Sequence, residues 1–163
     1  MRAGRSRILF ICGSRNQTTQ MHQIASALPE HEHAFTPFYV DGPLEWARRA
    51  GLVEFTVAGD KLVRRCLDYL EGQGLPVDMR GAAGGYDLVL SPSDLFVQGN
   101  ARQGRLVLVQ EGILDPEDWV FRLWRRFSFL PRWLAGTSTS GLSHAYDRFC
   151  VASSGYRAHF IRN

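Results

Sequence analysis

Lysine, cysteine and long apolar runs are scarce in this chain of 163 residues. Lys61 is the only lysine among 19 basic residues, and the formal net charge is +3. No apolar run approaches the roughly 18 residues that a membrane span needs. The run ILFIC, after the basic start MRAGRSR, is too short for the core of a signal peptide. Since the sequence also contains no nucleic-acid-binding motif, we expect a cytoplasmic protein that does not bind nucleic acid.

The three cysteines lie far apart in the sequence and form no CxxC pair. Cys12 and Cys150 fall in apolar runs typical of strands, and Cys66 falls on the apolar stripe of a helical pattern. We therefore predict three buried free thiols, because an unpaired cysteine behaves as a small apolar residue. No cluster of His and Cys residues indicates a metal site, and no cofactor is predicted.

Several common nucleotide-binding and nucleophile motifs are missing as well. The loop after the first apolar run starts with Gly13, but Arg15 and Gln17 occupy positions where a GxGxxG loop needs glycine. This excludes the usual dinucleotide fingerprint of nicotinamide dehydrogenases. The chain has no GxxxxGK[ST] sequence and no GxSxG elbow, so a P-loop enzyme and an α/β-hydrolase are also disfavoured.

The hydrophobic content of 45% is enough for a sizeable core. Five apolar runs read as strands, at 7–12, 34–40, 86–90, 105–109 and 148–151. Helical patterns separate them, the clearest at 60–71 and 119–127, and Ser153 is a plausible cap for a last helix at 153–162. This alternation predicts a single α/β domain over 1–163, with a Rossmann-like parallel sheet of about five strands and helices on both faces. Pro37 places the second strand at an edge.

Ligands of open α/β sheets bind outside the carboxyl ends of the strands, so the residues after each strand are the candidates for a site. Asp94 and Glu111 follow successive strands, where paired carboxylates could act as general acid and base or bind sugar hydroxyls. The alternative is that they are solvated or cap helices. The other candidates for substrate binding are polar or titratable residues near strand ends: Ser14, Asn16, Gln17, Thr18, His22, His144 and Ser153. For Asn16 and Thr18 the alternative is helix capping, and for His144 it is an ordinary place in a loop.

Three segments resemble the N-terminal domain of the GT-B glycosyltransferase and UDP-N-acetylglucosamine 2-epimerase superfamily. They are RILFICGSRNQTTQMHQIASAL, the pair YDLVLSPSD and RLVLVQEGI, and SHAYDRFCVASSGYRAHFIRN. Asp94 and Glu111 match the family's acids by their positions after the strands. The His-Gly-Asp of the epimerases is Pro92-Ser93-Asp94 here, and their His-x-Glu-Ala-Gly is Val109-Gln110-Glu111-Gly112. Because both histidines are replaced, the resemblance favours a glycosyltransferase-like role over epimerisation.

The resemblance implies an acceptor-side half of a sugar-nucleotide enzyme, inactive alone. A nucleotide-sugar donor would bind only together with a second, nucleotide-binding C-terminal domain, which we expect to be absent from this chain. Two alternatives stay open at this point. One is an epimerase-like half in which Asp94 and Glu111 transfer protons, and the other is a non-catalytic binding or assembly module.

The segment 121–134 combines four arginines with five aromatic residues. One helix face could bury Leu123, Trp124 and Phe127 against the sheet, which leaves the other rings without a place. Such a mixture suits an anionic membrane surface or a lipid-linked acceptor. The residues predicted to make this contact are Phe121, Arg122, Arg125, Arg126, Phe129 and Trp133. The protein would then lie at the inner membrane surface. The alternatives are a helical hairpin that buries the rings, or a contact between subunits of a homo-oligomer.

Overall fold

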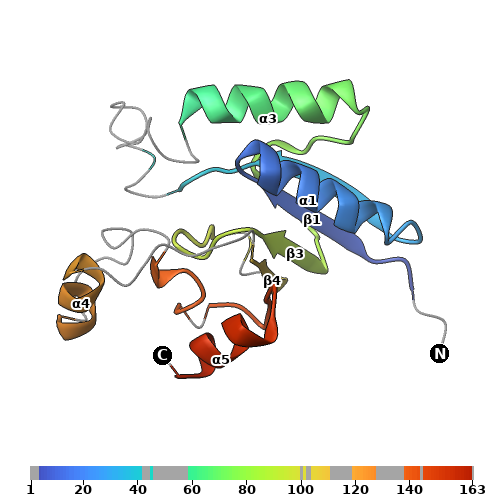
Figure 1. Ribbon diagram of the computed structural model, residues 1–163. Helices are drawn as coiled ribbons and strands as arrows, with labels where there is room; N and C mark the ends of the chain where they lie inside the picture. Colours follow the sequence, from blue (N-terminus) through green and yellow to red (C-terminus); the bar gives the residue numbers. More distant parts are fainter. Residues whose placement is uncertain are drawn as a thin grey trace.

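The computed structural model describes residues 4–41, 45, 59–99, 101, 104–110, 119–127, 138–143 and 145–162. Its centre is a sheet of five strands in the order β2-β1-β3-β4-β5, and every neighbouring pair is parallel (Figure 1). The strands are β1 (Arg7–Cys12), β2 (Glu32–Pro37), β3 (Leu88–Ser91), β4 (Arg105–Val109) and β5 (Arg148–Cys150). The predicted five-stranded parallel sheet is therefore confirmed.

The second strand lies at an edge of this sheet, as Pro37 predicts. It begins and ends earlier than the run 34–40 suggests, and Pro37 is its last residue. Beyond β2 the described chain adds a single bridge, in which the Phe35 N–H donates to the Pro76 carbonyl at 2.8 Å and the Asp78 N–H donates to the Phe35 carbonyl at 2.9 Å. The short 3-10 helix η1 (Met79–Gly81) follows directly, so this connection is tied closely to β2.

Two helices, α1 (Arg15–Ser26) and α3 (Asp60–Gly72), lie side by side over one face of the sheet (Figure 1). Side chains of β1 that alternate along the strand point into this face, and they share its core with Met21 of α1 and with Cys66 and Leu70 of α3. The bounds of α3 agree with the predicted 60–71 helix. Its apolar stripe is buried because it packs on this face.

The opposite face of the sheet is covered mainly by loop residues. Leu9 and Ile11 of β1 and Val89 of β3 pack there with Phe38, and partly buried rings of the connecting loops complete the cluster. Strands covered on both faces read as continuous apolar runs, which is why β1, β3 and β4 are recognisable from the sequence. At the far end, α5 (Ser154–Arg162) joins β5 through a contact between the rings of Phe149 and Phe160, with centroids 4.6 Å apart.

Helix α4 (Trp119–Arg126) turns the opposite face inward from the one expected. Phe121 is buried, with 2% exposure, and its ring contacts Trp124 at a centroid distance of 5.9 Å. Leu123 and Phe127 are 41% and 44% exposed, and Trp119 is 72% exposed. The expectation that Leu123 and Phe127 pack on the sheet was wrong. Phe121, predicted as a lipid contact, is inside the protein. Among the described residues, no helix has the length and apolar character to cross a membrane.

One of the three thiol predictions was also wrong. Cys12 and Cys66 are buried, whereas Cys150 is exposed. Cys150 ends a strand of three residues at the edge of the sheet, and in the described part of the chain no further strand lies beside it. The hydrogen bond with Cys66 and burial raise the pKa of the Cys12 thiol far above its ordinary value, which keeps this thiol protonated.

Candidate functional site

The sheet order creates a topological switch point between β1 and β3. The chain leaves β1 toward β2 on one side, and β3 lies on the other side of β1. In sheets of this order a crevice opens beyond the carboxyl ends of these two strands, and ligands bind there. We call the carboxyl-end edge of the sheet, with the residues that follow its strands, the rim.

Polar residues with little or no exposure gather at this rim. Buried polar groups need hydrogen-bond partners. A concentration of them at one edge of the sheet indicates either a binding site there or loops that are held together by side-chain hydrogen bonds. Most of the buried polar side chains among the described residues lie near strand ends. The full set is Gln17, Thr18, Thr36, Ser91, Asp94, Gln98, Gln110, Ser138 and Thr139.

The loop after β1 starts helix α1 with a capping box. The Gln17 N–H donates to Ser14 Oγ at 3.3 Å, and the Ser14 N–H donates to Gln17 Oε1 at 2.9 Å. Thr18 Oγ1 donates to the Ser14 carbonyl at 2.8 Å. Ser14, Gln17 and Thr18, all predicted to bind substrate, therefore form the start of the helix. For Thr18 this is the capping role given above as the alternative. Asn16 is exposed beside them and is the one whose side chain faces solvent.

Asp94 follows β3 as predicted, but it is 1% exposed. One carboxylate oxygen accepts the Gly141 N–H at 2.8 Å, and the other accepts the Ser143 N–H at 3.1 Å. The carboxylate thus ties the end of β3 to the loop before β5. A general base must reach a substrate proton, and a carboxylate with this burial and these partners is better suited to holding a loop.

Gly141, one of the two partners of Asp94, occupies a position that requires glycine. Its φ is +83°, and a Cβ at this position would lie 2.4 Å from the Phe149 ring and 2.8 Å from the Phe160 ring. Both the backbone conformation and the space therefore require glycine. The packing of the Phe149 ring of β5 and the Phe160 ring of α5 therefore sets the position of the Gly141 N–H that binds Asp94.

The remaining predicted site residues are Glu111, His144, Ser153 and His22. Glu111 and His144 lie outside the described residues. Ser153 caps α5, because its Oγ accepts the Tyr156 N–H at 3.3 Å. His22 lies eight residues into α1, where its Nδ1 is 3.1 Å from the Tyr69 hydroxyl.

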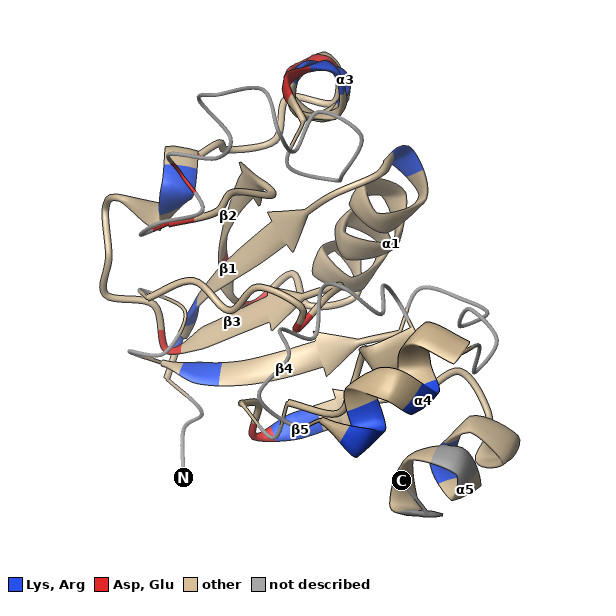
Figure 2. Cartoon of the chain, turned by 90° about the vertical axis from the view of Figure 1, so that its left-hand side faces the viewer, with Lys and Arg blue, Asp and Glu red and all other residues tan. Residues whose placement is uncertain are grey.

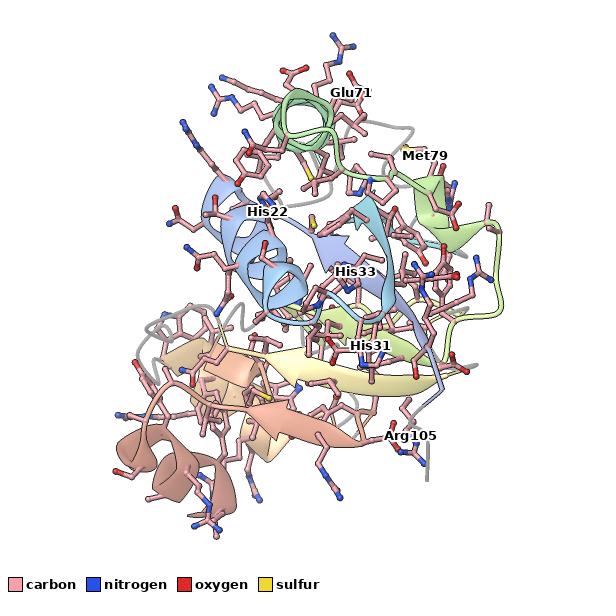
Figure 3. The ribbon with its side chains drawn as sticks, turned by 90° about the vertical axis from the view of Figure 1, so that its right-hand side faces the viewer. His22, His31, His33, Glu71, Met79 and Arg105 are labelled. Atoms are coloured by element: carbon pink, nitrogen blue, oxygen red, sulfur yellow. The ribbon has the colours of Figure 1, made fainter. Side chains whose placement is uncertain are left out.

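His22 faces the amino-end half of the sheet and not the rim. With His31 and His33 it lines an open cavity of about 520 Å³ beside the start of β2 (Figure 3). Within the described part of the chain, no group of three or more His, Cys, Asp or Glu residues is arranged to hold a metal ion. The three histidines are therefore neighbours that line one cavity.

The residue that the sequence did not single out is Gln20. Its Nε2 donates to the Gln110 carbonyl at 3.1 Å, just past the end of β4. Its Oε1 is buried and has no hydrogen-bond partner among the described residues. Gln110 in turn accepts the Ala152 N–H on its side-chain oxygen at 3.1 Å, so the pair is anchored to β5. The signal was a glutamine one turn after Gln17 on the same helix, facing the strand ends.

Arg80 is a second residue that sequence patterns do not reveal. It has φ 61°, a left-handed conformation that costs free energy for a residue other than glycine. Its N–H donates to Thr36 Oγ1 at 2.8 Å, and its guanidinium donates to the Val40 carbonyl at 3.0 Å and lies 3.6 Å from Glu45. These contacts hold the chain that follows β2, beside a pocket of about 190 Å³.

A larger cavity of about 770 Å³ lies between the start of α1 and α3. Its lining residues come from both helices: Ser14, Arg15, Asn16, Leu62, Arg65, Asp68 and Tyr69. Asn16 and Ser14 thus both line a cavity, and Ser14 also caps the helix start.

Comparison with known proteins gave no match: no family model, curated protein or solved structure is similar enough to the chain to report. What is shown is an α/β protein with a five-stranded, all-parallel, Rossmann-like sheet.

Proposed function

We propose that this chain is the acceptor-side half of a glycosyltransferase-like sugar-nucleotide enzyme of GT-B type. The observation that carries the proposal is the buried, unpartnered Oε1 of Gln20 at the rim. An amide oxygen with a free lone pair accepts a hydrogen bond from a hydroxyl group, which is the group that a glycosyl acceptor supplies. The strand order supports the same edge of the sheet, because ligands of open α/β sheets bind beyond the carboxyl ends of the strands at a switch point.

In this proposal the chain binds and orients the acceptor, and a nucleotide-sugar donor binds only when a second domain closes the crevice. Transfer requires both reactants to be held in near-attack geometry. The chain alone is therefore expected to bind an acceptor weakly, to bind UDP negligibly and to give no turnover. An epimerase-like role would require Asp94 to transfer a proton, and its burial against two backbone N–H groups favours the acceptor-binding role instead.

The test is an NMR titration of the isotope-labelled chain with methyl β-glucoside, a probe of a glycosyl acceptor, and separately with UDP and UDP-N-acetylglucosamine. Methyl β-glucoside should shift the amide signals of residues 13–20, 91–94 and 110. UDP should shift none of them. Micromolar binding of UDP by the chain alone would overturn the assignment as the acceptor side, and so would the absence of glucoside shifts at the rim.

A matched pair of variants locates the contact. Gln20→Met keeps the shape of the side chain and removes its amide, so glucoside affinity should fall by about fivefold, the scale of one neutral hydrogen bond. Gln23→Met changes an exposed glutamine on the same helix and should leave the affinity unchanged. Equal effects of the two variants would exclude a contact through Gln20.

We also propose that α4 rests on an anionic membrane surface, where a lipid-linked acceptor would be found. Trp119 and Leu123 lie one helical turn apart and are exposed on the same face. The same helix carries Arg122, Arg125 and Arg126 and no acidic residue (Figure 2). Exposed apolar groups beside cations suit the boundary between headgroups and acyl chains of an anionic bilayer. Trp119 here takes the place expected for Phe121. Phe129 and Trp133 lie outside the described residues.

A further inference from the structure

The cavity between α1 and α3 is lined by two arginines and one aspartate, so its lining has a net positive charge. Arg15 enters it from the start of α1 and Arg65 from α3. Within the described chain, neither guanidinium makes a hydrogen bond or an ion pair. Asp68 also lines the cavity, but it is not within ion-pair distance of either arginine there. The charges are thus free to meet a ligand.

The position of Arg15 is unfavourable for the helix that carries it. It lies in the first turn of α1, and that turn contains no acidic residue. Helix dipoles favour negative groups at this end and disfavour cations. A second cation, Arg65, faces the same space. This arrangement works against the stability of the free protein, and an anion bound between the two arginines would compensate for it.

The rest of the lining provides hydrogen-bonding groups and an apolar wall. Asn16 contributes an amide, and Leu62 provides the apolar contact. Tyr69 brings a hydroxyl group that is held 3.1 Å from His22 Nδ1, so its position is set by a partner outside the cavity. With a volume of about 770 Å³, the cavity has room for a small molecule and not only for a simple ion.

We propose that this cavity binds an oxyanion, the phosphate or carboxylate group of a small ligand, between Arg15 and Arg65. Guanidinium groups match such oxygens with paired, charge-assisted hydrogen bonds. The inference does not rest on the glycosyltransferase proposal, because it depends on α1 and α3 and not on Gln20 or on the crevice. If the proposed function is also correct, the acceptor is an acidic one whose charged group enters this cavity.

Calorimetric titration with inorganic phosphate, and separately with acetate, tests the site on the chain itself. Phosphate should saturate one site, with an affinity that falls as salt is raised, because screening weakens the attraction. Tighter binding of phosphate than of acetate would assign the site to a phosphate group, and the reverse order to a carboxylate. Failure of both anions to saturate would overturn the proposal.

Neighbouring arginines on α3 provide a matched control. Arg65→Gln and Arg15→Gln should each weaken anion binding by about tenfold or more, since each removes a charge-assisted contact. Arg64→Gln removes the same charge from an exposed position next to Arg65 but outside the cavity lining, and it should change the affinity by less than twofold. An Arg64→Gln effect as large as that of Arg65→Gln would show that only the net charge matters and would contradict the site.

The two proposals fail separately. Gln20→Met should affect methyl β-glucoside and leave phosphate binding intact, whereas Arg65→Gln should do the opposite. Circular dichroism melts of all variants check that the fold is retained. These substitutions are at surface positions or keep side-chain shape, so little change is expected.

Discussion

The Asp94 carboxylate accepts hydrogen bonds from the N–H groups of Gly141 and Ser143, which lie 47 and 49 positions further along the chain. Replacing it with alanine removes two charge-assisted hydrogen bonds and leaves both donors without their acceptor. We expect a loss of roughly 2 to 4 kcal/mol in the free energy of unfolding. Urea denaturation monitored by fluorescence measures it.

The control for Asp94→Ala is Glu71→Gln, at an exposed acidic position on α3. This substitution should change the free energy of unfolding by less than about 0.5 kcal/mol. If Asp94→Ala were equally mild, the carboxylate would not be the clamp of the loop before β5, and its use as a catalytic group would again be the simpler explanation.

Tyr86 gives the protein a dependence on alkaline pH. Burial, with a further contribution from the hydrogen bond that its hydroxyl donates to Asp78, raises its pKa from 10.0 to about 12. The folded state therefore holds the phenolic proton more tightly than the unfolded chain. This contribution to stability is fully present below pH 10 and is lost as the pH rises from about 10 to about 12.

Tyr86→Phe tests this dependence, because it removes the titrating group and keeps the ring under Arg7. The variant should be less stable than the natural protein at pH 8, and the difference should shrink between pH 10 and pH 12. Melting temperatures across this range measure it. A constant difference at all pH values would show that Tyr86 does not titrate as the environment of its hydroxyl requires.

At the scale of an element, α4 has a surface that the sequence pattern did not orient. Phe121 and Trp124 lie three residues apart on one side, and Trp119, Leu123 and Phe127 repeat every four residues on another. Both rows satisfy helical spacing, so periodicity cannot decide which one is buried. The choice depends on packing against distant parts of the chain, and here Phe121 is the ring that is enclosed.

Binding of α4 to lipid is expected to depend on its outward row. Trp119→Ser with Leu123→Ser should reduce co-sedimentation with vesicles that contain anionic phosphatidylglycerol, and added salt should reduce it further. Met79→Ser removes an exposed apolar side chain elsewhere and should have no effect. A monodisperse sample that fails to sediment with these vesicles at low salt would leave α4 as a protein contact.

The elements themselves were largely predictable, and the site was not. Buried strands such as Arg105–Val109 are continuous apolar runs, and Asp60–Gly72 has one clear apolar stripe, so local pattern is enough. The roles of Asp94 and Gln20 depend on partners such as Gly141 and Gln110 that are far away in the sequence. No spacing rule indicates such pairs. The sequence pattern of a polar residue after a strand is the same whether that residue binds a substrate or holds a loop.

At the scale of the whole molecule, β1 is the best-protected element. It has a strand on each side and packed side chains on both faces, whereas β5 is a short edge strand with two exposed residues. Amide exchange followed by mass spectrometry should be slowest for peptides that cover β1 and much faster for β5. Equal protection of the two strands would mean that the sheet opens only as a single unit.

The central place of β1 also affects how the chain is made. Arg7 and Asp87, at the beginnings of β1 and β3, are 80 positions apart, yet they are hydrogen-bonded neighbours. During synthesis β1, α1 and β2 leave the ribosome first. At about 5–20 residues per second, they wait roughly 3 to 10 seconds for β3. Throughout that interval one edge of β1 lacks its neighbouring strand, and the apolar side chains of Leu9 and Ile11 lack Val89 and Leu106. The nascent chain is therefore most vulnerable to aggregation at this stage, and it is then that a chaperone would be most useful.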